Sequence, residues 1–90
     1  MKLYREIENS FPMIEKLFSQ ETLLEFKNAT IFELHLYNVR LSVWIENNID
    51  SFRKSLLYNL FVESGVKNTE EMSLFMILLF HYNLNIVKQL

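Results

Sequence analysis

The sequence contains no cysteine and only one glycine and one proline. Without cysteine the chain has no disulfide, no thiolate metal ligand and no cysteine nucleophile. With so little glycine and proline it has neither a flexible linker nor the glycine-rich loop that binds phosphate groups. A chain free of disulfides fits a reducing compartment, so we expect a cytoplasmic protein.

Long hydrophobic runs and an excess of one charge sign are also missing. The longest apolar stretch, residues 72–80, is interrupted by Ser73 and is much shorter than the ~20 residues that cross a bilayer as a helix. The first six residues alternate between charged and apolar side chains, so we expect no secretory signal and no membrane partner. The formal net charge of -2 argues against a nucleic-acid partner held by its phosphates.

Half of the 90 residues are hydrophobic, which is ample for a core. At this length a single domain over residues 1–90 is expected. Pro12 suits the first turn of a helix capped by Ser10, and Gly65 suits the left-handed residue that ends a helix. We therefore predict a mainly α fold, a compact bundle of four to five short helices.

The first part of the chain is expected to form several short segments. The helical period predicts a helix over 11–19, and residues 2–9 are either a further short helix or a frayed arm. A short helical turn over 23–27 is expected because Thr22 and Glu25 have the spacing of a capping box.

Two later helices are predicted from their caps. Asp50 or Ser51 can begin a helix that ends at the glycine. Asn68 or Thr69 can begin the last helix, which is apolar on every side and either ends or loosens at residues 83–85. A helix of this composition is expected to be central or to lie at an interface.

The segment from 30 to 46 has two interpretations. A capping box between Thr30 and Glu33 favours a helix. The alternative is an α+β fold with a β-hairpin over 31–46, because apolar and polar residues also alternate on either side of Tyr37 and Asn38. As a helix, the segment has two apolar faces; one is Phe32, Leu36, Val39 and Val43, and the other is Leu34, Tyr37, Leu41, Trp44 and Ile45.

The residues that could carry chemistry do not form a recognisable site. His35 and His81 lack the spacing of metal ligands, and His81 follows an apolar run in which a buried histidine bonded to a neighbour is expected. The adjacent Glu70 and Glu71 are typical of the first turn of a helix, where they complement its dipole. We expect no enzyme, no metal and no cofactor.

A protein partner is the remaining expectation, because a domain this small buries only about 60% of its unfolded surface. The proposed binding residues are the second apolar face of the 30–46 helix and two further residues, Arg40 and Tyr58. These two are included because arginine and tyrosine are common at interfaces. The full set is Leu34, Tyr37, Arg40, Leu41, Trp44, Ile45 and Tyr58.

Three alternatives stay open. The chain's own neighbours could cover both faces of that helix, or the faces could pair in an obligate homodimer, a structural or adaptor subunit. A nucleic-acid-binding regulator is a further alternative, because residues 56–80 have the order helix, short turn, helix. Against it, the second of these helices is apolar and begins with two glutamates.

The order of features resembles small uncharacterised bacterial helical domains encoded beside toxin-immunity genes. The resemblance is carried by Phe11–Pro12 at the start of the first helix, residues 44–47 at the end of the second, Glu63 near the end of the third, and the apolar last helix. It implies an inhibitor or immunity-type protein that binds and occludes a partner, and it identifies no functional residue. The composition, rich in Asn, Ile, Leu and Phe, also suits a phage-encoded inhibitor of a host defence protein.

Overall fold

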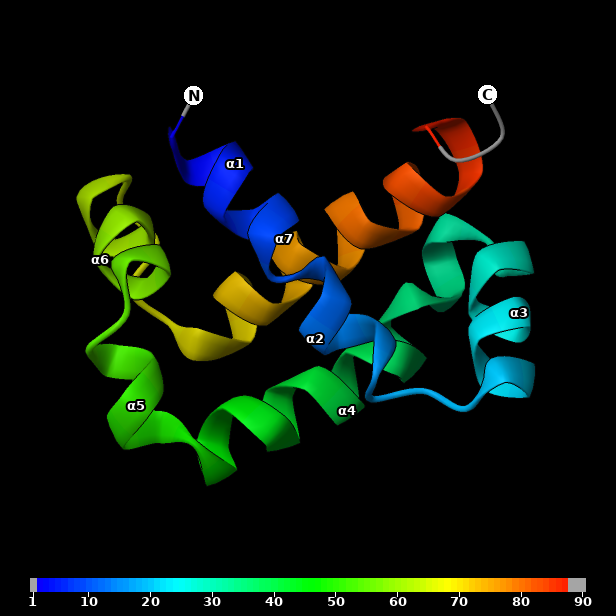
Figure 1. Cartoon of the computed structure of the whole chain (residues 1–90), viewed down its shortest axis with the longest axis horizontal. Helices are drawn as coiled ribbons and strands as arrows, with labels where there is room; N and C mark the ends of the chain where they lie inside the picture. Colours follow the sequence, from blue (N-terminus) through cyan, green and yellow to red (C-terminus); the bar gives the residue numbers. More distant parts are fainter. Residues whose placement is uncertain (1, 88–90) are drawn as a thin grey trace.

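The computed structural model describes residues 2–87, and every regular element in that range is helical (Figure 1). The mainly α prediction is confirmed, and the 30–46 segment is helical instead of a β-hairpin. In chain order the elements are α1 (Lys2–Asn9), α2 (Phe11–Glu15), α3 (Gln20–Asn28), the 3-10 helix η1 (Ile31–Glu33), α4 (Leu34–Asn47), α5 (Ile49–Arg53), α6 (Leu56–Glu63), α7 (Thr69–Tyr82) and the π-helix η2 (Asn83–Val87).

The two 14-residue helices, α4 and α7, pack against each other along their length. Their polar contacts show that they run antiparallel. The buried Ser73 of α7 donates a hydrogen bond to the Asn38 side chain, and the Thr69 hydroxyl, one turn earlier, donates to Glu46 at 2.9 Å. These bonds fix the register of the pair. α1 and α6 lie side by side, and α1 also contacts α7 (Figure 1).

Four phenylalanines from different segments form the centre of the core. Phe26 of α3 is fully buried, and its ring lies 5.5 Å from that of Phe18 and 5.6 Å from that of Phe80. Phe11 of α2 contacts Phe80 at 5.3 Å. Since the segments that hold them are far apart in the chain, these rings bring α2, α3 and α7 into one unit.

Two helix starts differ from those predicted. Ser19 caps α3, because its hydroxyl accepts a bond from the Thr22 N–H at 3.1 Å. Thr22 therefore lies inside the helix, and the predicted cap at Thr22 and the helix over 11–19 are both corrected. Ser55 caps α6 in the same way by accepting from the Tyr58 N–H at 3.1 Å.

The cap at Ser55 divides one predicted helix into α5 and α6. Asp50 and Ser51, the predicted caps, therefore lie inside α5. The described residues therefore contain more helices than the four to five predicted, and two of these helices have 14 residues. Residues 2–9 form a helix whose Ile7 is buried, so they are part of the fold and not a frayed arm.

The predicted cap at Ser10 is wrong, because its hydroxyl donates to the Ile7 carbonyl at 2.6 Å and makes no cap bond to α2. Three other signals at helix ends are confirmed. Gly65 has φ +94°, a left-handed conformation that strains other residues. The Asn68 side chain accepts the Glu70 N–H at 2.7 Å and so begins α7. The last helix changes to π-helical geometry from Asn83 onward, as the loosening at 83–85 predicted. None of the described helices is long and apolar enough to cross a membrane.

Candidate protein-binding surface

Burial separates the two apolar faces of α4. Leu34, Leu41 and Ile45 are buried in the molecule's own core. The prediction that they form an exposed binding face is therefore corrected. The physical reason is that α7 and the phenylalanine cluster dock on this side of α4 and cover it.

The remaining members of the predicted set are dispersed. Tyr37 is half-buried with its ring 5.1 Å from that of Phe26, and Trp44 is half-buried against the core. Arg40 is exposed, and its guanidinium lies 5.8 Å from the ring centre of Phe18. Tyr58 belongs to α6 and lines a different hollow. The structure therefore does not gather these residues into one exposed surface.

The opposite side of α4 is the exposed apolar face. We call its four residues the outer face of α4: they are Phe32, 85% exposed, Leu36, 62%, Val39, 61%, and Val43, 52%. Single exposed apolar residues are ordinary, but neighbouring ones on one face mark interaction sites.

The spacing of these four residues is that of a coiled-coil seam. Steps of four, three and four residues match the a and d positions of a heptad, which form a narrow stripe along a helix. The last three residues belong to α4 itself, whereas Phe32 precedes it in η1. The outer face is thus shaped to receive another helix.

A hydrogen-bonded cap holds the start of this surface in place. Oε1 of Glu33 accepts bonds from the Thr30 N–H at 2.8 Å and from the Thr30 hydroxyl at 3.0 Å. These bonds, the backbone one first, hold the pKa of the Glu33 carboxyl below its ordinary value. His35 donates from Nδ1 to the Phe32 carbonyl at 2.9 Å, a bond between η1 and the first turn of α4.

Charged and polar side chains border the outer face on both sides. In heptad terms Glu33 and Arg40 occupy e positions, and His35 and Ser42 occupy g positions. All but the half-buried Ser42 are exposed. One border therefore carries one charge of each sign.

A second, less exposed apolar area lies on α7. Leu74 and Phe75 are exposed, and they line a shallow hollow together with Leu78. Phe75 also borders a pocket of about 390 Å³ between α1, α6 and α7. They are also at helical spacing, but only two of them are exposed, Leu74 by 38% and Phe75 by 47%, so this area is smaller than the outer face of α4. The helix-turn-helix alternative would use α7 to read DNA, yet this helix packs against α4 and α1.

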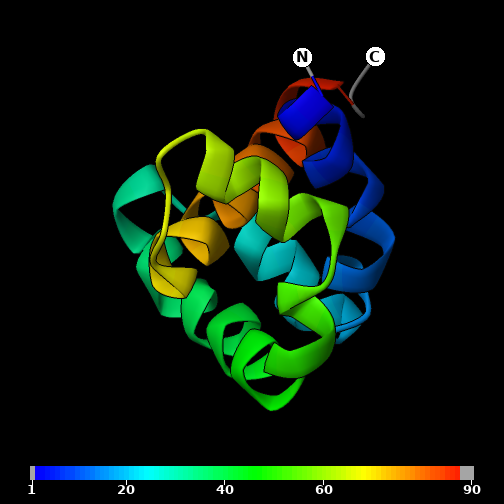
Figure 2. The same cartoon turned by 90° about the vertical axis from the view of Figure 1, so that its left-hand side faces the viewer.

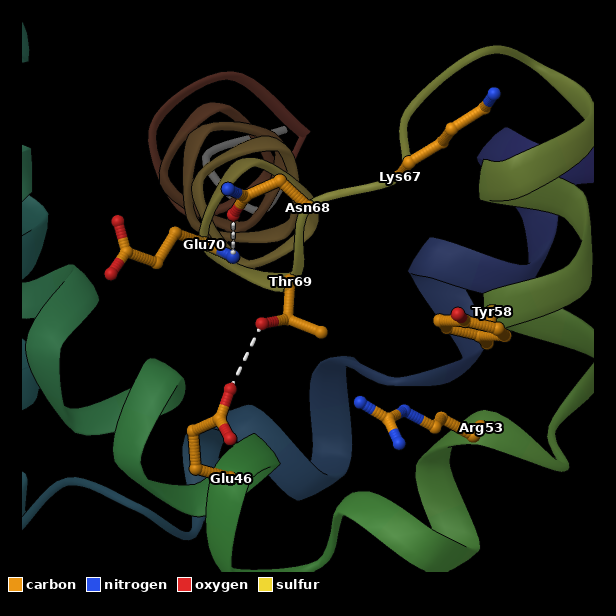
Figure 3. Close-up of a pocket in the computed structure, with 7 residues that line it drawn as sticks. All are labelled: Glu46, Arg53, Tyr58, Lys67, Asn68, Thr69 and Glu70. Atoms are coloured by element: carbon orange, nitrogen blue, oxygen red, sulfur yellow. Dashed lines mark hydrogen bonds between the residues drawn. The ribbon is translucent and has the colours of Figure 1, made fainter.

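A polar hollow of about 370 Å³ lies where α4, α5, α6 and α7 approach one another (Figure 3). Two carboxylates and two cationic groups are present, but the Lys67 amine points away from the other side chains in Figure 3. The Thr69 hydroxyl is bonded to Glu46. Among residues 2–87 no group of three or more potential ligands is placed to hold a metal ion. The hollow is lined by Glu46, Arg53, Tyr58, Lys67, Asn68, Thr69 and Glu70.

The predicted face and the outer face were both visible in the sequence, and only the assignment of the exposed one was missed. The available signal was width. The buried face has five residues, including a tyrosine and a tryptophan, whereas the outer face is a stripe of four at strict heptad spacing. A narrow stripe fits a single partner helix, and a broad one fits a protein core.

Comparison with known proteins identifies the family. A family model described as a domain of unknown function, DUF6794, matches residues 5–84. The chain therefore belongs to this family. The searches of curated proteins and of solved structures gave no match.

Proposed function

We propose that this DUF6794 protein is a non-enzymatic protein-binding module that receives a helix of its partner along the outer face of α4. One observation carries the proposal. Four large apolar side chains, each more than half exposed, follow one another at coiled-coil spacing along η1 and α4, and the other side of α4 is buried.

The geometry of the outer face favours a helix as the bound element. The stripe extends over 11 residue steps from Phe32 to Val43, which corresponds to about 16 Å along a helix axis. About three turns of a partner helix would cover that length. Its bordering charges have both signs, which favours a protein with mixed charges over a polyanion.

An inhibitor or immunity-type role is the form of this function that the sequence resemblance suggests. In such a role the module would occlude the surface of its partner. The outer face supports the binding of a partner. The experiment below identifies that partner.

The experiment is site-specific photo-crosslinking in the native host. A photoreactive phenylalanine analogue at Phe32 should give one defined crosslinked species, whereas the same group at the exposed Glu63 of α6 should give none. The species should disappear when Val39→Glu is added, because a charge in the stripe opposes burial. Mass spectrometry then identifies the bound protein, and the complex is rebuilt from purified components.

Equal crosslinking from positions 32 and 63, or crosslinking unchanged by Val39→Glu, would contradict the proposed function. Loss of crosslinking in Val39→Glu is informative only if this variant is folded. The circular dichroism spectrum of Val39→Glu should match that of the wild type, since position 39 is exposed.

A further inference from the structure

We propose that the outer face of α4 binds the same face of a second copy of this chain, with the two α4 helices antiparallel. This inference rests on the binding role proposed above and names the occupant. It is carried by the self-complementarity of the surface in size and in charge.

The apolar residues pair by size in one antiparallel register. In antiparallel coiled coils each a residue lies opposite a d residue of the other helix. With Leu36 opposite Val39 of the second copy, Phe32 lies opposite Val43 of the second copy, and the same pairs recur by symmetry. Each layer then combines a large side chain with a valine, so the distance between the two helix axes is similar along the interface.

The same register pairs the charges at its border. The e position of one helix then faces an e position of the other, and this brings Glu33 to Arg40 of the second copy, twice in the dimer. His35 similarly faces Ser42 of the second copy. A parallel pairing would instead bring His35 near Arg40 and leave Glu33 without a cation, so charge favours the antiparallel arrangement.

Both charged groups are accessible for such contacts. The Thr30 cap uses only Oε1 of Glu33, and this residue lies at the surface. The exposed Arg40 donates a long hydrogen bond, 3.4 Å, to the Leu17 carbonyl, and its guanidinium lies 5.8 Å from the Phe18 ring centre. The later part of α4 and its junction with α5 lie at the lower margin of the molecule in both views (Figures 1 and 2).

The size of the surface sets the expected strength. A stripe of about 16 Å is shorter than the contact that buries about 800 Å² per partner in a standard stable interface. We therefore expect a reversible dimer that forms as concentration rises, in place of an obligate one.

Disulfide trapping tests the register directly, because the natural chain has no cysteine. Leu36→Cys and Val39→Cys are prepared as separate chains and oxidised alone and as a mixture. The antiparallel register predicts a crosslinked dimer mainly in the mixture, since positions 36 and 39 face each other across the interface. Lys54→Cys on an exposed segment is the control for random collision.

Three outcomes would overturn the inference. A parallel dimer would crosslink each variant with itself more than with the other. Random collision would give the same yield in all samples, Lys54→Cys included. Absence of any crosslinked dimer at high concentration would show that a second copy does not occupy this face.

Sedimentation velocity of the unmodified chain provides the second measurement. Its weight-average sedimentation coefficient should rise with concentration, and Val39→Glu should weaken self-association by about 10-fold or more. A strict monomer that still crosslinks to another protein through Phe32 would overturn this inference and keep the proposed function. A strict monomer with no crosslink to any protein would overturn both.

Discussion

Two adjacent residues of α4 show how sharply its sides differ. Val43 is half exposed on the outer face, whereas Trp44 packs against the core. Val43→Glu should change the free energy of unfolding by no more than about 0.5 kcal/mol. Trp44→Glu should cost about 2 kcal/mol or more, because it removes aromatic packing and brings a charge to the edge of the core. Urea unfolding followed by circular dichroism measures both.

The result decides which side of α4 is structural. Equal destabilisation by the two substitutions would mean that Val43 is also packed. A larger loss for Val43→Glu would reverse the assignment of the faces.

Two phenylalanines provide a matched pair at the same scale. Phe26 is fully buried at the centre of the aromatic cluster, and Phe32 is the most exposed large apolar residue of those described. Phe26→Ala should destabilise the fold by about 3–5 kcal/mol through lost burial and the cavity left behind. Phe32→Ala makes the same chemical change, yet it should alter stability by less than about 0.5 kcal/mol.

Urea denaturation of the two alanine variants, at a concentration where the chain is monomeric, is the appropriate comparison. A marked loss of stability for Phe32→Ala in the monomer would mean that its ring packs within the chain. The outer face would then lose its largest contact residue.

At the scale of elements, η1 and the start of α4 depend on one carboxylate. The bonds from Thr30 lower the pKa of Glu33 from its ordinary value of 4.5, so folding favours the charged form. A lowered pKa adds stability above the ordinary value, and this contribution is lost as the pH falls through the folded-state pKa. The stability advantage of the wild type over Glu33→Gln should therefore be constant near neutral pH and shrink below about pH 4.5.

Glu33→Gln is the suitable comparison because glutamine keeps an acceptor for the cap and removes the titration. Urea unfolding between about pH 7 and pH 3 gives the difference directly. A difference that does not vary with pH would mean that the cap does not prefer the ionised carboxylate.

The same elements show what the sequence could predict. The helix over 30–46 was favoured over the hairpin by Thr30 and Glu33, and these residues do form the cap. Gly65 and Asn68 also marked helix ends correctly, because each signal is local and needs no tertiary contact.

The missed boundaries depended on distant contacts. Ser19 and Thr22 are both good caps, and the local sequence does not choose between them. Ser19 is the cap in the folded chain, where the neighbouring Phe18 is buried against Phe26. The exposed face of α4 is a different case, because the greater width of the buried stripe is a signal that the sequence itself carries.

At the scale of the whole molecule, the proposed dimer predicts how charge variants behave when they are mixed. Glu33→Arg in one chain and Arg40→Glu in another give homodimers with like charges facing each other. In the mixed dimer every e position meets an opposite charge. Each variant alone should therefore self-associate more weakly than the wild type, and the mixture should associate more strongly than either variant.

The mixing experiment separates pairing from damage to the fold. Glu33→Arg also removes the Thr30 cap, and Arg40→Glu removes a cation beside Phe18, but both losses persist in the mixed dimer. A gain on mixing can therefore come only from contacts between chains. Sedimentation velocity at low salt measures this gain, and about 1 M salt should reduce it, because the screening length then falls to about 3 Å. A mixture that associates no better than its components would contradict the antiparallel register and leave the apolar stripe as the only basis for association.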